Sequence, residues 1–120
     1  MTKLVEMDVA VPLRAQMADP GTEPVVLVNV FHVPHDEVDG FVTGWTASAR
    51  LLRTKPGFVS TKLHRGIAGS TTFLNYAVWA NTAAYREAMG SPDVRAALQA
   101  DTGGATASPH LFRTVAIDEI

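Results

Sequence analysis

The sequence of 120 residues predicts an α+β domain built on one antiparallel sheet. Short runs rich in β-branched and aromatic residues alternate with segments whose apolar residues recur at helical spacing. Two of these runs are joined by the five-residue turn 66–70, which predicts a β-hairpin. Hydrophobic residues make up 47% of the chain and charged residues 18%, and this composition favours an ordered globular domain.

The first half of the domain is predicted to be a strand followed by a helix. Residues 25–33 (VVLVNVFHV) are almost all apolar and lie between two prolines, which is typical of a strand that is apolar on both faces. In residues 36–53 the apolar side chains follow helical spacing, with Asp36 as a candidate N-cap. Lys55-Pro56-Gly57 would stop this helix.

The second half is predicted to be a hairpin, a broken helix and a last strand. Residues 58–65 and 72–79 form the two hairpin strands. The helix starts at Thr82 and is interrupted at Gly90-Ser91-Pro92, after which Ser91 and Pro92 favour a new helical start. We expect a loop of Gly, Thr and Ser at 101–109 and the last strand at 111–117.

The resulting order, β-α-β-β-α-β, is the ferredoxin-like arrangement, with both helices on one face of the sheet. The other face then has no cover within the chain. Because the strand 25–33 is apolar on both sides, we expect a second sheet to pack against it. The sequence therefore predicts a homodimer in which two sheets face each other.

Residues 1–24 differ from the rest and are predicted to be an N-terminal arm, ahead of a domain at 25–120. Prolines and a glycine punctuate them, and they carry two basic and four acidic residues. Alternation of Val9, Val11 and Leu13 permits a short extra strand there.

Charge and residue usage exclude several function classes. A net charge of -2 and a pI of about 6.0 argue against a nucleic-acid binder, and the absence of cysteine excludes disulfides and thiolate sites. No apolar run reaches the length of a membrane helix and no signal-peptide pattern is present, so we expect a cytoplasmic protein that does not bind membranes. The histidines lack metal-ligand spacing and no Gly-rich phosphate loop is present, so we expect neither metal nor cofactor. The four histidines are His32, His35, His64 and His110.

One face of the strand 72–79 carries a candidate pocket floor. Alternation places Phe73, Asn75, Ala77 and Trp79 on the same side, which gives an amide, a small residue and an indole in a row. Asn29 is a second amide inside an apolar strand, and if it faces the helices, both amides point into one cavity suited to an oxygenated ligand. The alternative is a core tryptophan beside asparagines satisfied by nearby loops.

The broken second helix carries two further candidates, Tyr85 and Arg95. The break at residues 90–92 could aim both side chains at a common point. The alternative is that Tyr85 is a core aromatic residue and that Arg95 lies on a solvated helix face.

Three segments together resemble the antibiotic biosynthesis monooxygenase family: KPGFVSTKLHR at 55–65, NYAVW at 75–79 and AAYR at 83–86. The resemblance covers about residues 24–118. It implies a dimeric α+β barrel of ferredoxin-like subunits.

Within that family the sequence is most similar to the cofactor-independent oxygenases of aromatic polyketide pathways, which convert an anthrone or phenol to a quinone with molecular oxygen. This similarity implies four catalytic residues: Asn75, Trp79, Tyr85 and Arg95. It also implies that no cofactor is bound. As substrate-binding residues we add Asn29, Trp45, Phe73 and His64.

Three other functions stay open at this point. The chain could be a barrel that binds or helps to cyclise a polyketide without oxidising it, or a dimeric barrel with no catalytic role. It could also belong to the heme-degrading branch of the family, whose asparagine on the first strand is matched by Asn29. That branch has a tryptophan and a histidine ligand on the second helix, where this chain has Ala88 and Leu98.

Overall fold

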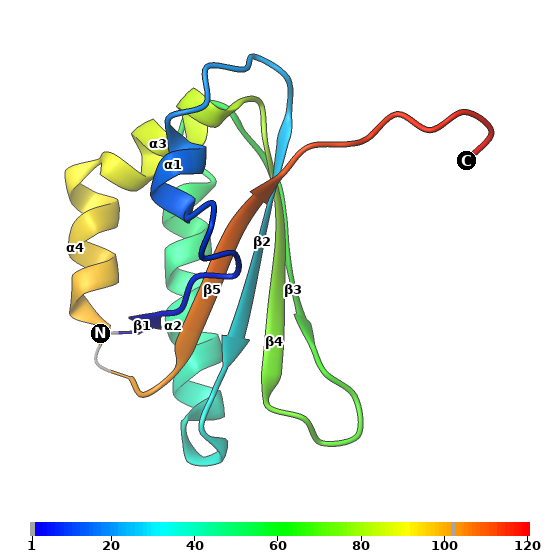
Figure 1. Cartoon of the computed structure of the whole chain (residues 1–120). Helices are drawn as coiled ribbons and strands as arrows, with labels where there is room; N and C mark the ends of the chain where they lie inside the picture. The colour runs from blue at the N-terminus through cyan, green and yellow to red at the C-terminus, as the bar shows by residue number, and fades with distance from the viewer. Residues whose placement is uncertain (1, 102) are drawn as a thin grey trace.

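In the computed structural model, which describes residues 2–101 and 103–120, a five-stranded sheet carries its helices on one face (Figure 1). The strand order is β1-β5-β2-β4-β3, and only the pair β1–β5 is parallel. This confirms the predicted ferredoxin-like α+β fold. The strands are β1 (Lys3–Leu4), β2 (Val25–His32), β3 (Phe58–Arg65), β4 (Thr72–Trp79) and β5 (Thr106–Phe112). The helices are α1 (Leu13–Met17), the 3-10 helix η1 (His35–Glu37), α2 (Val38–Leu52), α3 (Thr82–Gly90) and α4 (Pro92–Ala100).

The predicted hairpin is confirmed, with β3 and β4 at the bounds expected from the sequence. The turn into β3 needs a glycine at position 57. Gly57 has a φ of 84°, and a Cβ there would lie 2.4 Å from the Cβ of Ala84. The close approach of α3 to this turn therefore requires a residue without a side chain at position 57.

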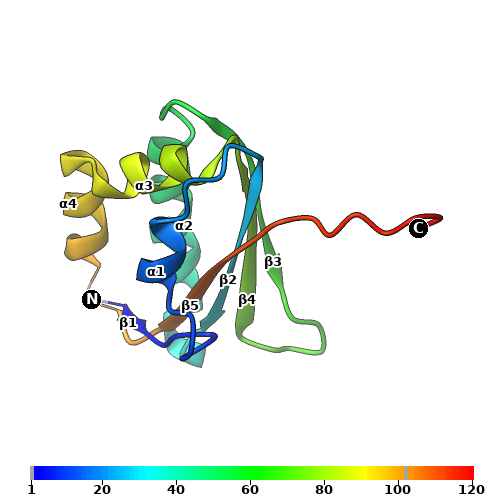
Figure 2. The same cartoon turned by 45° about the horizontal axis from the view of Figure 1, so that its top comes forward.

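The helical layer follows the sequence with small differences at the helix ends (Figure 2). Asp36 lies inside η1 and caps nothing, because the N-cap position of α2 is Glu37 and makes no side-chain cap. The break between α3 and α4 falls at Ser91, as predicted, although the Ser91 hydroxyl donates to the Ala88 carbonyl instead of capping α4. The start of α3 is capped by Asn81, whose side chain accepts from the Ala84 N–H at 2.8 Å.

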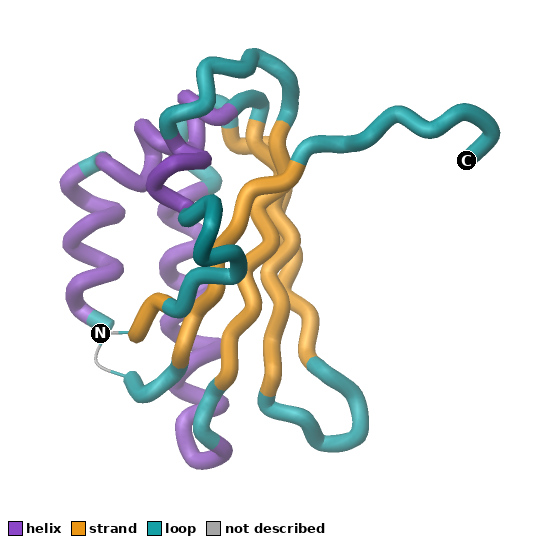
Figure 3. Tube along the Cα trace, viewed as in Figure 1, coloured by secondary structure: helices purple, strands orange, loops and turns teal. Residues whose placement is uncertain are grey.

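The last strand was predicted wrongly: β5 covers Thr106–Phe112, most of which we expected to be loop, and residues 113–117 are not a strand. Pairing with β2 runs from Thr106 to Phe112 and overrides the weak strand propensity of Ala107, Ser108 and Pro109. Pro109 is tolerated because its nitrogen points to the outer edge. The N–H of Leu111, two residues on, points the same way and is taken by Gln16. The chain beyond β5 extends away from the body (Figure 3).

Most of the N-terminal residues contact the domain. The alternating stretch Val9, Val11 and Leu13 does not form a strand. Leu13 is instead the first residue of α1, and Pro12 occupies the N-cap position of this helix. Leu13 and Met17 pack against the main core, and the Gln16 side chain bonds both the N–H and the carbonyl of Leu111 at 2.9 Å. The amide thereby takes the place of a neighbouring strand at the edge of β5.

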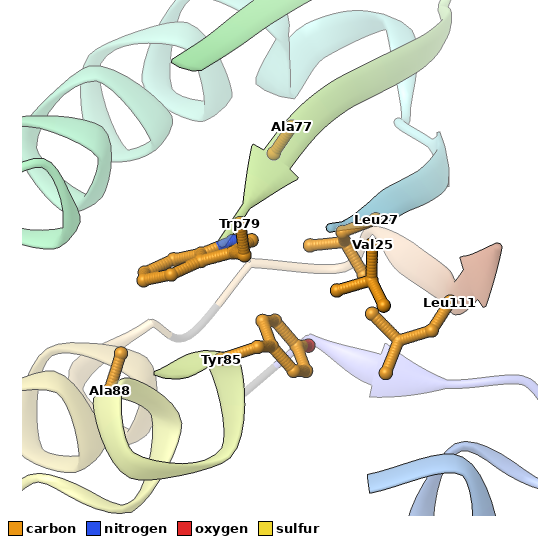
Figure 4. Packing of buried hydrophobic residues seen from close by; sticks show 7 residues of the cluster. All are labelled: Val25, Leu27, Ala77, Trp79, Tyr85, Ala88 and Leu111. Atoms are coloured by element: carbon orange, nitrogen blue, oxygen red, sulfur yellow. The ribbon is translucent and has the colours of Figure 1, made fainter. Parts of the chain in front are cut away.

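The core between sheet and helices consists of two clusters. The first contains Trp79 and Tyr85, with β2 and β5 contributing to it (Figure 4). The second surrounds Phe73 and Val33, at the opposite end of β4. Together they place aromatic side chains at both ends of the helix-facing side of the sheet.

The sheet face without helices carries Val26, Val28 and Val30 of the central strand, which are half-buried within one chain. Among the described residues, no helix is long and apolar enough to cross a membrane.

Candidate functional site

The two amides predicted from the strands lie side by side. Asn29 of β2 and Asn75 of β4 are direct partners in the antiparallel register. Asn75 shares its face with Phe73, Ala77 and Trp79, which are buried beneath the helices. Directly opposed residues project from the same face, so both amides point into the layer between sheet and helices.

A threonine on the neighbouring strand orients one of these amides. The Thr61 hydroxyl of β3 donates to Asn75 Oδ1 at 2.6 Å. Asn29 Oδ1, in contrast, is buried and has no hydrogen-bond partner among the described residues. The pair therefore contains one amide whose acceptor is occupied and one whose acceptor is not.

Sequence reasoning missed Thr61. Threonine is common in strands, so its presence in FVSTKLHR carries no signal. Its position opposite Ala77, two residues along β4 from Asn75, follows only from the register of β3 on β4.

Aromatic residues border the amide pair at both ends. Phe73 lies two residues before Asn75 on the same face, about 7 Å along the strand, with the Phe41 ring of α2 at 5.0 Å. Trp79 lies four residues beyond Asn75, about 13 Å along the strand, and the small Ala77 stands between them.

Trp45 lies above the middle of this row. Phe41 packs in the cluster around Phe73, and Leu52 packs in the cluster around Trp79, so α2 spans both ends. Trp45 is four residues after Phe41 and seven before Leu52, on the same side of the helix. It is therefore level with the amides.

Helix α2 is only partly buried at this point. None of the 15 residues of α2, all of them described, is fully buried. Asn29, although it lies on the central strand beneath the helices, is also only half-buried. Part of this residue stays accessible, although its Oδ1 atom is buried. We therefore place the candidate site between Asn29, Asn75, Thr61 and Trp45.

Tyr85 stands behind Trp79 and not beside the amides. Its ring centroid is 5.8 Å from that of Trp79, which also meets Phe58 edge-on at 5.3 Å. Tyr85 is 2% exposed, and burial raises the pKa of its phenol above the ordinary value of 10.0. The hydroxyl thus keeps its proton at any physiological pH.

Arg95 and His64 are not brought to the amide pair within one chain. Arg95 is exposed on α4, next to the buried Val94. His64 projects from the opposite face of the sheet, where its Nδ1 lies 3.3 Å from the Leu74 carbonyl oxygen. The four residues predicted to be catalytic therefore include three on the helix-facing side, Asn75, Trp79 and Tyr85, and one at the surface.

Two surface hollows were also found, and the first of them is lined in part by Thr61. One, of about 420 Å³, is on the sheet face without helices and is lined by Ser60, Thr61, Lys62, His64 and Tyr76. The other, of about 340 Å³, lies between α1 and β5 and reaches Val25, Thr82 and Leu111. Neither is lined by the amides.

The geometry defines a class of protein: a small α+β domain with an amide pair, bordered by aromatic rings, beneath a loosely packed helix. Such a site suits a flat, mostly apolar molecule that carries oxygen atoms. The chain belongs to the antibiotic biosynthesis monooxygenase family, whose family model matches residues 24–100.

Solved structures agree with this assignment. SnoaB, a cofactor-independent oxygenase from Streptomyces nogalater, is 26% identical with a TM-score of 0.63, over 82% of this chain and 99% of its own. A candidate monooxygenase from Shewanella loihica is 29% identical with a TM-score of 0.69, over 81% of this chain and 99% of its own. A Deinococcus radiodurans protein, at 15% identity and a TM-score of 0.69 over 80% of this chain and 97% of its own, shares the fold. No curated protein sequence matches the chain. The family and the oxygenase likeness together support a monooxygenase.

Proposed function

We propose that this protein is a cofactor-independent monooxygenase that oxidises an aromatic polyketide-type phenol or anthrone with molecular oxygen. The observation that carries the proposal is the amide pair Asn29–Asn75 between two groups of aromatic rings. The likeness to SnoaB, described as a cofactor-independent oxygenase, supports the same reaction class.

The substrate itself supplies the electrons in this reaction. Dioxygen is a triplet and reacts slowly with closed-shell molecules, so most enzymes use a flavin or metal. An anthrone can instead lose a proton from its methylene carbon to water, which leaves a carbanion whose charge is delocalised onto the carbonyl oxygen. One electron then passes to dioxygen, and the resulting superoxide and carbon radical combine to form a C–O bond.

The remaining steps complete the balance. The peroxide anion takes up a proton, the second methylene proton leaves, and the O–O bond breaks with departure of hydroxide, which becomes water. One anthrone and one dioxygen thus give one quinone and one water. The carbon is oxidised and dioxygen is reduced, and no external reductant is consumed.

The protein's task is to favour the anions and to move protons. Asn75 Nδ2 and the Trp79 indole N–H are the donors that we assign to the developing oxyanion. Tyr85, which burial keeps protonated, is assigned as proton donor to the peroxide, through water. Arg95 is assigned a weaker role as a cation at the surface of α4. Trp45 and Phe73 hold the rings.

Oxygen consumption tests this function directly. Dithranol, an anthrone with two hydroxyls beside the carbonyl, is added to the protein in an oxygen electrode, and quinone formation is followed by absorbance. After subtraction of spontaneous oxidation, we expect turnover by the wild-type chain and a rate lower by about 10²–10³-fold for Asn75→Ala, because one donor to the oxyanion is lost.

Tyr76→Phe is the matched control, since Tyr76 follows Asn75 on the same strand but faces the opposite side. It should keep the wild-type rate. Equal rates for Asn75→Ala and wild type would remove Asn75 from the mechanism. Tight binding of dithranol without oxygen consumption would instead identify a binding protein.

A further inference from the structure

The amide pair has an unusual hydrogen-bonding state. Asn29 and Asn75 are direct cross-strand partners on one face, which places their Cβ atoms about 5 Å apart. An asparagine amide can donate to the oxygen of a neighbouring amide across such a distance. Yet Asn29 Oδ1 is buried and has no partner among the described residues, so the two amides do not satisfy each other.

Thr61 determines which end of the Asn75 amide faces the site. Its hydroxyl donates to Asn75 Oδ1 at 2.6 Å, so that oxygen is held toward β3. The Nδ2 group, on the other arm of the planar amide, is then directed away from Thr61, toward the side of β2. Asn75 is thereby presented to the layer as a donor.

Asn29 provides the complementary group. Its Oδ1 is an acceptor that has no hydrogen-bond partner in the part of the chain that the structure describes. Buried polar atoms are nearly always paired, and an exception suggests a group that a ligand satisfies. A donor on β4 and an acceptor on β2 therefore stand next to each other over the central strands.

Resting on the function proposed above, we propose that Thr61 is a positioning residue that fixes the amide pair as a donor beside an acceptor, and that this pair selects aromatic substrates carrying a carbonyl or phenolate oxygen next to a hydroxyl. The substrate's acceptor oxygen receives the Asn75 Nδ2 hydrogen bond, and the neighbouring hydroxyl donates to Asn29 Oδ1. Rings without the hydroxyl offer no donor to Asn29 Oδ1.

Binding without oxygen tests this proposal separately from turnover. Dithranol and unsubstituted anthrone are titrated anaerobically into the protein, and quenching of the fluorescence of Trp45 and Trp79 is measured. Dithranol has the carbonyl and the neighbouring hydroxyl, whereas anthrone has only the carbonyl. We expect the wild-type chain to bind dithranol at least about tenfold more tightly, since one buried hydrogen bond is gained.

Three variants separate positioning from a merely structural role. Thr61→Val keeps the shape of the side chain but cannot hold Asn75 Oδ1, so the preference for dithranol should fall to about twofold or less while anthrone affinity changes little. Thr61→Ser restores the hydroxyl and should restore the preference. Thr72→Val makes the same change on the opposite face of β4 and should behave as wild type.

The outcomes distinguish this proposal from the proposed function. A wild-type chain that binds both probes equally, or binds neither, overturns the donor–acceptor assignment, and so does a Thr61→Val variant with wild-type preference. A chain that prefers dithranol and loses that preference in Thr61→Val, but consumes no oxygen, supports the assignment while contradicting the oxygenase. A chain that oxidises anthrone but binds dithranol no more tightly than anthrone supports the oxygenase and contradicts the donor–acceptor assignment.

Discussion

Burial keeps the phenol of Tyr85 protonated. The ring is 2% exposed, and burial raises the pKa of the phenol above 10.0, whereas in the unfolded chain the phenol has its ordinary pKa. Above pH 10 the unfolded state therefore loses a proton that the folded state keeps. The contribution of Tyr85 to stability is complete below pH 10 and is lost as the pH rises further.

We predict that the free energy of unfolding falls by about 1.4 kcal/mol more in wild type than in Tyr85→Phe between pH 9 and pH 11. Urea unfolding of both proteins at the two pH values measures this difference, and the remaining titrating groups cancel because both chains share them. Parallel pH dependence of wild type and Tyr85→Phe would contradict the buried, protonated phenol.

At the scale of single elements, α1 fastens the N-terminal residues to the edge of the sheet. The Gln16 amide holds the N–H and carbonyl of Leu111, and Nη1 of Arg86 donates to the carbonyl of Met17 at 2.6 Å. The family match begins at residue 24, so this helix lies outside the matched segment. The strand edge that it covers would otherwise present unpaired backbone groups.

We predict that Gln16→Leu lowers the free energy of unfolding by about 1–3 kcal/mol, because two backbone groups of β5 lose their partner. Chemical denaturation measures the change. Arg14→Ala, on the exposed side of the same helix, is the control and should lie within about 0.5 kcal/mol of wild type. If the two variants are equally stable, the helix contributes little to the fold.

The elements also show what the sequence could predict. Hairpin strands β3 and β4 were predicted residue by residue, because β-branched runs and a glycine-containing turn specify them locally. Strand β5 was misplaced, because its middle residues Ala107, Ser108 and Pro109 are poor strand formers and the pairing with β2 specifies it. For the site, the amides could be found as polar residues inside apolar strands. Thr61 could not, since its role depends on a cross-strand contact.

On the scale of the whole molecule, the helices cover one face of the sheet, and none of the described residues forms a second layer on the other face (Figure 1). That face carries an apolar row on β2 with further apolar side chains on its neighbours. The residues are Val26, Val28, Val30, Leu74, Val78 and Phe112. Beyond β5 the chain extends away from the body and exposes Val115 and Ile117, at 76% and 63%. Exposed apolar surface of this kind favours association.

We propose that two copies pack through these sheet faces, as the sequence predicted, and that Val28 lies near the centre of the contact, because it is flanked by Tyr76 and His110 in the sheet. Val28→Asp would bury a charge there without a partner, which costs far more than a surface substitution. Light scattering should therefore give twice 12.8 kDa for wild type and 12.8 kDa for the variant. Val42→Asp, at an exposed valine of α2 on the helical side, should remain dimeric. A Val28→Asp chain that keeps the mass of two copies would place the contact elsewhere, and a monomeric wild type would mean that the apolar sheet face is tolerated in water.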